Sequence, residues 1–117
     1  MFEAAELGRK IGKEEYRKQE PGLRTELLRR QFELRDRDFP VVIVLGGNDR
    51  ESCYEVLNLL HEWMDPRFVE GNAWGAPTEE ERERPLFWRY WRALPSRGRI
   101  GVFVRAWTTQ EIVLRLL

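Results

Sequence analysis

Three short apolar runs, separated by helical patterns, organise the chain. Residues 41–45 are five consecutive apolar residues, which predicts a strand buried on both faces, as in a parallel sheet. Residues 100–104 predict a second such strand, and residues 68–70 predict a short strand between them. Strands that alternate with helices predict an α/β fold, here with a small parallel sheet of about three strands.

The first third of the chain has a helical and highly charged pattern. Residues 13–19 predict a polar helix or turn that ends near Glu20 and Pro21. Pro21 suits the start of a second helix, which is expected to run to about Asp36. Its expected apolar face consists of Leu23, Leu27, Leu28, Gln31 and Leu34. Residues 1–38 are interpreted as an N-terminal helical extension, and residues 39–117 as a single α/β unit.

Further helices are expected after the first strand. One begins near Ser52 and ends near Met64, because Asp65 and Pro66 stop it. Its apolar residues have helical spacing: Val56, Leu59, Leu60 and Trp63.

The second half of the chain predicts three more helical segments. Thr78 and Glu81 form a capping box that starts a helix through the acidic run at 79–84. Pro85 interrupts this helix, and residues 86–94 continue as a second segment. A turn over residues 95–98 precedes the last strand, and a final helix is expected over residues 107–117.

The turn after the first strand has the layout of a phosphate-binding loop without its residues. The motif G-x-x-x-x-G-K-[ST] needs a strand, a glycine turn and a helix, in that order. Counting from Gly47, the second glycine is Ser52, the lysine is Cys53 and the hydroxyl residue is Tyr54. Because backbone amides and the lysine hold the phosphates, this turn is expected to bind them weakly.

Charge near the same turn also disfavours phosphate binding. A phosphate within about 4 Å of Asp49 or Glu51 would be repelled by a few kcal/mol, which Arg50 offsets in part. Over the whole chain, 20 basic and 20 acidic residues give zero net charge, so composition does not favour nucleic acid or a membrane surface. The single cysteine and the lack of an apolar segment of spanning length predict a cytoplasmic protein.

Longer motifs resemble a known family. The strings FPVVIVLGG, WMDPR, ERERPLFWRYWRALP and GRIGVFVRAW stand in the order and spacing of family-2 polyphosphate kinases. The resemblance extends from Met1 to about Thr109. It is greatest to the N-terminal half of tandem polyphosphate:AMP phosphotransferases. It implies part of a three-layer, thymidylate-kinase-like P-loop fold. It also implies phosphoryl transfer from polyphosphate to AMP or ADP, with Mg²⁺ as cofactor.

The resemblance also assigns roles by position. The loop aspartate is Asp49, which is kept, and the loop lysine is Cys53. The Asp-Arg pair that serves metal and phosphate in active members falls on Val104 and Arg105, so only the arginine remains. Asp49 and Arg105 are therefore interpreted as vestigial catalytic residues, and the loss of the lysine and the metal carboxylate argues against Mg²⁺ binding and catalysis by this chain alone. The lid helices that grip polyphosphate are expected beyond residue 117.

Several candidates have two interpretations. Asp49 is a catalytic residue or an ordinary turn residue, and Cys53 is a reactive thiol or a neutral replacement. The arginines near Trp88 and Trp91 form an anion or nucleotide surface, or they surround aromatic residues that pack into the core. Neither His61 nor any other residue has metal-ligand spacing, so no metal site is predicted. The candidate phosphate-binding residues are Gly47, Arg50, Ser52, Cys53, Arg84, Arg89 and Arg92.

Three functions follow from these observations. The first is a catalytically impaired polyphosphate kinase domain that acts as a structural or regulatory half. The second is a nucleotide phosphotransferase that works only with a partner chain. The third is a non-catalytic interaction module or truncated gene product, because a three-stranded sheet leaves an uncovered edge that favours a homo-oligomer. Polyphosphate and a nucleotide are the ligands that the resemblance implies.

Overall fold

A computed structural model describes residues 10–47 and 49–106 of the chain. Its strands are β1 (Val41–Leu45), β2 (Val69–Ala73) and β3 (Ile100–Val104), which form one parallel sheet in the order β1–β3–β2. The predicted α/β fold with a small parallel sheet is confirmed. Because the strands are parallel, their carboxyl ends lie at the same edge of the sheet.

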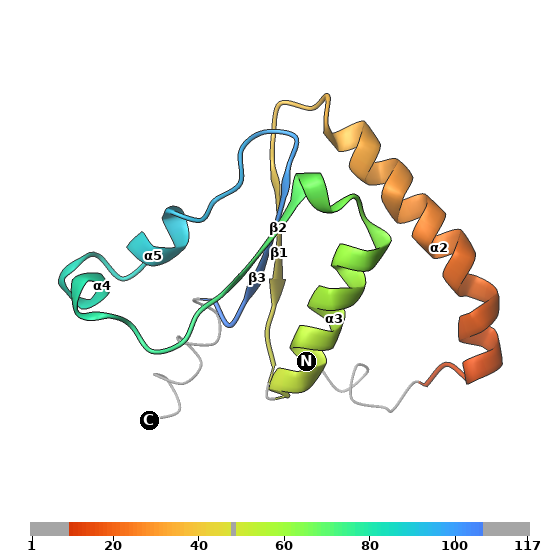
Figure 1. Cartoon of the computed structure of the whole chain (residues 1–117), viewed down its shortest axis with the longest axis horizontal. Coiled ribbons are helices and arrows are strands. Elements are labelled where there is room, and N and C mark those ends of the chain that lie inside the picture. Colours follow the sequence, from red (N-terminus) through yellow and green to blue (C-terminus); the bar gives the residue numbers. More distant parts are fainter. Residues whose placement is uncertain (1–9, 48, 107–117) are drawn as a thin grey trace, which may run out of the picture.

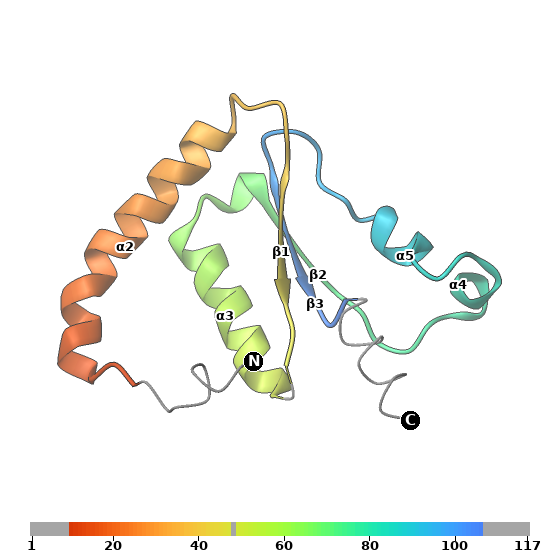
Figure 2. The same cartoon turned by 180° about the vertical axis from the view of Figure 1, so that it is seen from behind.

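Helices cover both faces of this sheet (Figures 1 and 2). The long α2 (Lys13–Leu34) and α3 (Arg50–Trp63) lie on one face, and the short α4 (Glu79–Glu83) and α5 (Trp88–Trp91) lie on the other. The expected three-layer arrangement is therefore present in the described part of the chain.

The core is centred on β3, whose five residues are all buried. Alternate residues of a strand point to opposite faces, and β3 supplies one apolar cluster on each. Val102 packs with Leu34 of α2 and Met64 after α3, whereas Phe103 packs with Tyr90 of α5. Trp74 completes the second cluster, with its ring centroid 4.9 Å from those of both Tyr90 and Phe103.

The prediction that residues 41–45 are buried on both faces is wrong. These residues form β1, which lies at an edge of the described sheet and is only half-buried, with Val44 36% exposed. β3 takes the central position instead. A run of apolar residues indicates a strand but does not distinguish the centre of a sheet from its edge.

The predicted helix break at Pro21 is also wrong. Helix α2 runs without interruption from Lys13 to Leu34, with Pro21 inside it. Proline cannot donate the helical hydrogen bond to the carbonyl of Arg17. That part of α2 is exposed, so water can bind the carbonyl instead.

The buried sides of α2 and α3 are narrower than predicted. On α2, Leu23 and Leu28 are exposed, and the packed residues are Leu27, Gln31 and Leu34. On α3, Val56 and Leu59 are exposed, and the residues that face the sheet are Cys53, Leu57 and Leu60. Helix α3 also begins at Arg50, two residues before the predicted start.

The remaining elements follow the prediction with shifted bounds. A 3₁₀ turn, η1 (Pro66–Phe68), precedes β2, so this strand begins after Phe68 rather than at it. The capping box of α4 is confirmed: Glu81 N donates to Thr78 Oγ1 at 3.2 Å, and Thr78 N donates to Glu81 Oε1 at 3.3 Å. Helix α5 is shorter than the predicted 86–94. The predicted helix over 107–117 lies outside the described residues.

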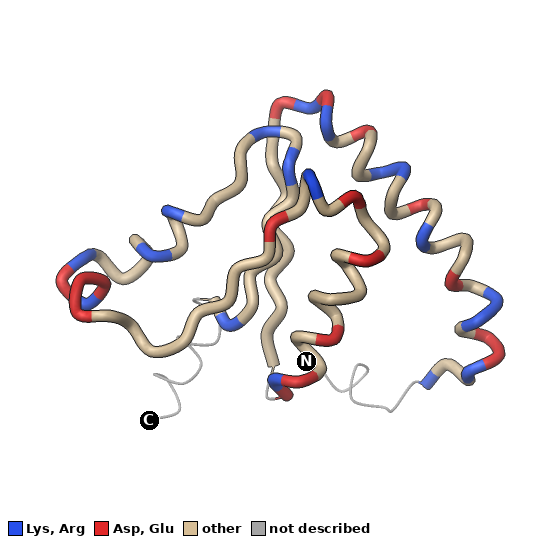
Figure 3. Tube along the Cα trace, in the orientation of Figure 1, with Lys and Arg blue, Asp and Glu red and all other residues tan. Residues whose placement is uncertain are grey.

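Charged residues of both signs alternate along α2, whereas the strands carry almost none (Figure 3). Glu26 pairs with Arg29 at 2.8 Å and with Arg30 at 3.0 Å, on the exposed side of the helix. Such pairs, three and four residues apart, are typical of a solvated helix side. No helix in the described ranges has the length and the apolar composition that crossing a bilayer requires.

Candidate functional site

The carboxyl edge of the sheet carries the glycine turn that links β1 to α3. Gly47 has φ 147°, a conformation that residues with a Cβ rarely adopt, so the turn requires glycine there. The amide of Arg105, which follows β3, donates to the carbonyl of Leu45 at 3.3 Å. The end of β3 therefore lies directly beside the start of the turn.

Asp49 is the N-cap residue of α3. Its carboxylate accepts hydrogen bonds from the amides of Glu51, at 3.1 Å, and Ser52, at 3.4 Å, and from the Ser52 hydroxyl. The hydroxyl bond, followed by the Ser52 amide, lowers the pKa of the Asp49 carboxyl below its ordinary value. The amides at a helix N-terminus are the groups that bind phosphate in a P-loop. Here a side chain of the same chain occupies two of them.

Cys53 is a buried residue on the side of α3 that faces the sheet. It belongs to the wall of an open cavity of about 360 Å³ that also contains the glycine turn. The other lining residues are Val44, Leu45, Gly46, Gly47, Asp49, Ser52 and Val56. At the position of the P-loop lysine, this cavity thus has a cysteine in place of a cation.

Arg105 has a strained backbone, with φ 58°, and is the one non-glycine residue with positive φ in the described ranges. Such strain is concentrated at functional sites. Its neighbour Val104 is fully buried and apolar, at the position where the resemblance expects a metal carboxylate.

The residues at this edge do not fit a Mg²⁺ site. Mg²⁺ in phosphotransferases is held by one or two carboxylates together with substrate phosphates. Val104 stands where the resemblance places one such carboxylate, and Asp49 is bound to the start of α3. Among the described residues, no three His, Cys, Asp or Glu side chains form a group that could hold a metal.

Arg84, Arg89 and Arg92 belong to the α4–α5 region, on the opposite face of the sheet from α3 (Figure 1). A cavity of about 340 Å³ there is lined by Pro77, Glu81, Arg82, Arg84, Leu86 and Arg89. It shares no residue with the cavity at the glycine turn. The structure therefore divides the predicted phosphate-binding residues between two separate places.

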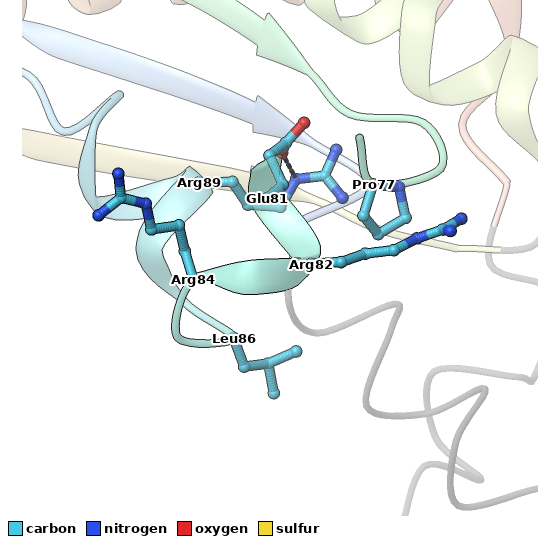
Figure 4. A pocket seen from close by; sticks show the side chains of 6 residues that line it. All are labelled: Pro77, Glu81, Arg82, Arg84, Leu86 and Arg89. Carbon is cyan, nitrogen blue, oxygen red and sulfur yellow. Dashed lines mark ion pairs between the residues drawn. The ribbon is translucent and has the colours of Figure 1, made fainter. Parts of the chain in front are cut away.

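Arg89 is part of the packing of this region. Its Nε atom lies 2.7 Å from Glu81 Oε2 in an ion pair, although the geometry is not that of a directed hydrogen bond. Its Nη2 atom donates to the carbonyl of Gly75 at 3.0 Å. Figure 4 shows Arg89 and Glu81 turned toward each other, with Arg84 and Arg82 pointing away from the pair. Arg89 thus ties α5 to α4 and to the loop before it.

Arg84 and Arg92 are exposed and contact one aromatic ring. Their guanidinium carbons lie 5.2 Å and 4.6 Å from the centroid of Trp88. The shared role of Trp88 was not predicted, yet the spacing of four residues on either side of it is a readable signal. Of the neighbouring aromatics, Tyr90 is buried and Trp91 is 58% exposed, so the prediction of aromatic packing holds only in part.

A parallel sheet with a glycine turn into a helix at its carboxyl edge defines an α/β protein of the P-loop type. Comparison with known sequences is more specific. The polyphosphate kinase 2 family matches residues 10–117, and the chain belongs to this family.

Two curated relatives are named polyphosphate:AMP phosphotransferase. The one from Pseudomonas aeruginosa is 44% identical over 117 residues, which are 99% of this chain and 24% of the relative. The one from Pseudomonas syringae pv. tomato is 39% identical over 113 residues, 96% of this chain and 23% of the relative. The chain thus spans about a quarter of the length of these relatives.

Solved structures agree with this assignment. A polyphosphate kinase 2 structure from Pseudomonas aeruginosa superposes with a TM-score of 0.87 at 45% identity, over 98% of this chain and 25% of that one. A second, from Arthrobacter aurescens, has a TM-score of 0.74 at 24% identity and covers 83% of this chain and 36% of that one, which supports the fold alone.

Proposed function

We propose that this chain is a catalytically impaired domain of a polyphosphate-dependent nucleotide phosphotransferase and acts as a structural or regulatory half. Its ancestral ligands would be polyphosphate and AMP or ADP, with Mg²⁺, in the cytoplasm. The observation that carries the proposal is that the Asp49 carboxylate is bound to the first amides of α3 with no lysine at position 53 to offset its charge. A phosphate at the same amides would meet a like charge in direct contact.

Two further observations support impairment. Cys53 leaves the turn without the cation that bridges phosphate oxygens in a P-loop. Val104 leaves it without a second carboxylate for Mg²⁺. In phosphoryl transfer, most of the rate comes from positioning and charge stabilisation by such groups. With them replaced, little remains to stabilise the transition state.

Calorimetry and a coupled assay test this proposal. We expect the purified chain to give no saturable heat with tripolyphosphate, with or without Mg²⁺, and no ADP from AMP and polyphosphate. The polyphosphate:AMP phosphotransferase of Pseudomonas aeruginosa is the positive control. Turnover, or micromolar Mg²⁺-dependent binding that Asp49→Ala abolishes, would overturn the proposal.

A matched variant examines the reason for the weak binding. Asp49→Ser keeps an N-cap side chain for α3 and removes the negative charge. If the carboxylate is what excludes an anion, this variant gains weak, salt-sensitive binding of tripolyphosphate relative to the wild type. Equal binding by both proteins would mean that the carboxylate is not the obstacle.

The second candidate function is a phosphotransferase that a partner chain completes. The strained backbone of Arg105 favours it, as do Arg84 and Arg92, for which no ion pair exists within the described ranges. The test is to mix the chain with the part of the Pseudomonas aeruginosa relative that it does not match. Activity that appears only on mixing and is lost in Arg105→Ala would support this function, and no activity in the mixture would exclude it.

A further inference from the structure

Three arginines from separate segments surround one aromatic ring at the end of the sheet where the strands begin. Their guanidinium carbons lie 3.9 Å (Arg35), 5.3 Å (Arg67) and 6.0 Å (Arg99) from the ring centroid of Phe68. These segments follow α2, form η1 and precede β3, and Figure 3 shows basic positions of all three near the top of the view. We call Arg35, Arg67 and Arg99 the amino-edge arginine cluster.

Only one of these arginines has an acidic partner at close range. Arg67 pairs with Asp65 at 2.7 Å. For Arg35 and Arg99, no side-chain hydrogen bond or ion pair exists in the described part of the chain. The low pKa of the Asp65 carboxyl is caused first by Arg67 and least by Arg35. Both unpaired arginines are exposed, so their N–H groups are open to a ligand.

The backbone that carries the cluster is held in place. Gly98 N donates to Phe39 O at 3.1 Å, and Val41 N donates to Arg99 O at 3.0 Å. Gly98 has φ 76°, and a Cβ on it would lie 2.7 Å from the carbonyl oxygen of Arg35, so this close approach requires glycine. Because the two segments are already fixed against each other, a ligand need not order them on binding.

An open cavity of about 240 Å³ adjoins the cluster between the starts of β2 and β3. Its apolar wall consists of Phe68, Val69, Leu94, Pro95 and Ile100. The remaining lining residues are Glu70, Ser96 and Arg99. A phosphate chain gains nothing from an apolar wall and is repelled by Glu70. A peptide that combines a carboxylate with an apolar side chain uses both the arginines and the wall.

We propose that the amino-edge arginine cluster binds an acidic segment of a protein partner, in which an aspartate or glutamate stands next to an apolar residue. An arginine packed over an aromatic ring keeps its N–H groups free, and these donate two parallel hydrogen bonds to a carboxylate. The carboxylate lies against Arg35 and Arg99, and the apolar side chain enters the cavity beside Phe68.

The place of this surface separates it from the candidate phosphate site. It lies at the amino end of β2 and β3, whereas the glycine turn lies at the carboxyl end of β1. In the sheet order β1–β3–β2, it is also on the side away from β1. The proposed docking surface therefore does not depend on whether the glycine turn binds phosphate.

Fluorescence anisotropy on the full chain tests the ligand chemistry. The probe is a labelled six-residue peptide that alternates glutamate and leucine. We expect saturable binding that added salt weakens. The same peptide with glutamine in place of glutamate should bind about tenfold more weakly or worse, since hydrogen bonds to a charged group are the stronger ones. No saturable binding, or equal binding of the two peptides, would overturn the proposal.

Substitutions that remove one positive charge locate the surface. Arg35→Gln and Arg99→Gln should each weaken binding of the glutamate peptide by about tenfold. The control is Arg30→Gln, on the exposed side of α2, where Arg30 pairs with Glu26. This variant should bind as the wild type does. An equal loss in Arg30→Gln would mean that the peptide responds only to net charge, which contradicts the proposal.

A conservative variant and a competitor examine the role of the guanidinium group. Arg35→Lys keeps the charge but lacks the planar fork, so it should also weaken binding, and wild-type affinity would count against the proposed contact. Tripolyphosphate should displace the peptide no more than sodium chloride does at equal ionic strength. Stronger displacement would identify a phosphate site and exclude a carboxylate ligand.

Nuclear magnetic resonance of the wild type gives a test that no substitution can confound by misfolding. The peptide should shift the Nε–H signals of Arg35 and Arg99 and leave that of Arg30 unchanged. Circular dichroism checks that each variant is folded. Peptide binding that leaves the signals of Arg35 and Arg99 in place would show that the ligand lies elsewhere and would end the proposal.

Discussion

Gln31 of α2 binds both backbone groups of Asp65, which lies 34 residues further along the chain. Gln31 Nε2 donates to the carbonyl of Asp65 at 2.9 Å, and the amide of Asp65 donates to Gln31 Oε1 at 2.7 Å. Gln31 is only 3% exposed and is the one buried polar residue in the described ranges. Its side chain thus fixes the last turn of α2 to the corner between α3 and η1.

The first prediction concerns this contact. Gln31→Leu keeps the size of the side chain but leaves the amide and the carbonyl of Asp65 without partners in a partly buried place. An unsatisfied buried group destabilises a protein by about 1–3 kcal/mol, and we expect a loss of this size in urea-induced unfolding. The control is Gln19→Leu, at an exposed position of the same helix, which should change stability by less than about 0.5 kcal/mol. Equal losses for the two variants would contradict the role of Gln31.

The second prediction separates Arg89 from Arg92. Arg89 is 9% exposed and is paired with Glu81, which is 17% exposed, so Arg89→Ala leaves a carboxylate with reduced access to water. Breaking a buried pair from one side typically destabilises by about 3–5 kcal/mol, and we expect the lower end of this range. Arg92→Ala, on the exposed side of Trp88, should be close to neutral. Thermal and denaturant unfolding of both variants measures the difference.

A double-mutant cycle shows whether the loss comes from the ion pair. If it does, the combined Glu81→Ala and Arg89→Ala variant is much less destabilised than the sum of the two single variants. Additive losses would mean that Arg89 contributes through its packing and its bond to Gly75, not through Glu81.

The order of the elements could be predicted from the sequence, but their burial could not. Apolar runs and proline or glycine stops locate β1, β3 and α3 because these signals are local. Whether β1 or β3 is central depends on which strands pair, and neither run carries a polar side chain that would mark it as the edge. Pro21 shows a second limit: it weakens a helix locally, yet α2 continues because Leu27, Gln31 and Leu34 pack after it. Tertiary contacts decide such cases.

The candidate site was predictable to the extent that it depends on strand ends. Asp49 and Arg105 follow two parallel strands, so the sheet brings them to one edge. The arginines near Trp88 cannot be distinguished in the sequence, because no local pattern indicates which of them is buried. Only the folded chain shows that Arg89 meets Glu81 while Arg84 and Arg92 flank one indole ring.

The third prediction concerns Cys53, for which a reactive thiol was one interpretation. Its side chain is buried between α3 and the sheet, and burial limits access of reagents to a thiol. We expect labelling with a disulfide reagent to be at least tenfold slower in the native chain than in the chain unfolded by urea. Equal rates would show that the start of α3 is open to solvent.

The fourth prediction is a change of stability at acid pH. Asp65 caps η1, and the hydrogen bond from the Arg67 side chain, followed by the Arg67 amide, lowers the pKa of its carboxyl from 3.8 to about 2. Because the pKa is lower in the folded state, the charged carboxylate stabilises the fold above about pH 4. This contribution is lost as the pH falls from about 4 to about 2, since the unfolded chain then binds the proton first.

Asp65→Asn keeps a capping side chain and the backbone groups that Gln31 binds, but it does not titrate. Its melting temperature should therefore fall less steeply than that of the wild type between about pH 4 and pH 2. Arg67→Met removes the largest cause of the low pKa, the side-chain hydrogen bond, and should make the decline over the same pH interval less steep. If the melting temperatures of all three proteins fall equally over this pH interval, the ion pair between Asp65 and Arg67 does not stabilise the folded chain.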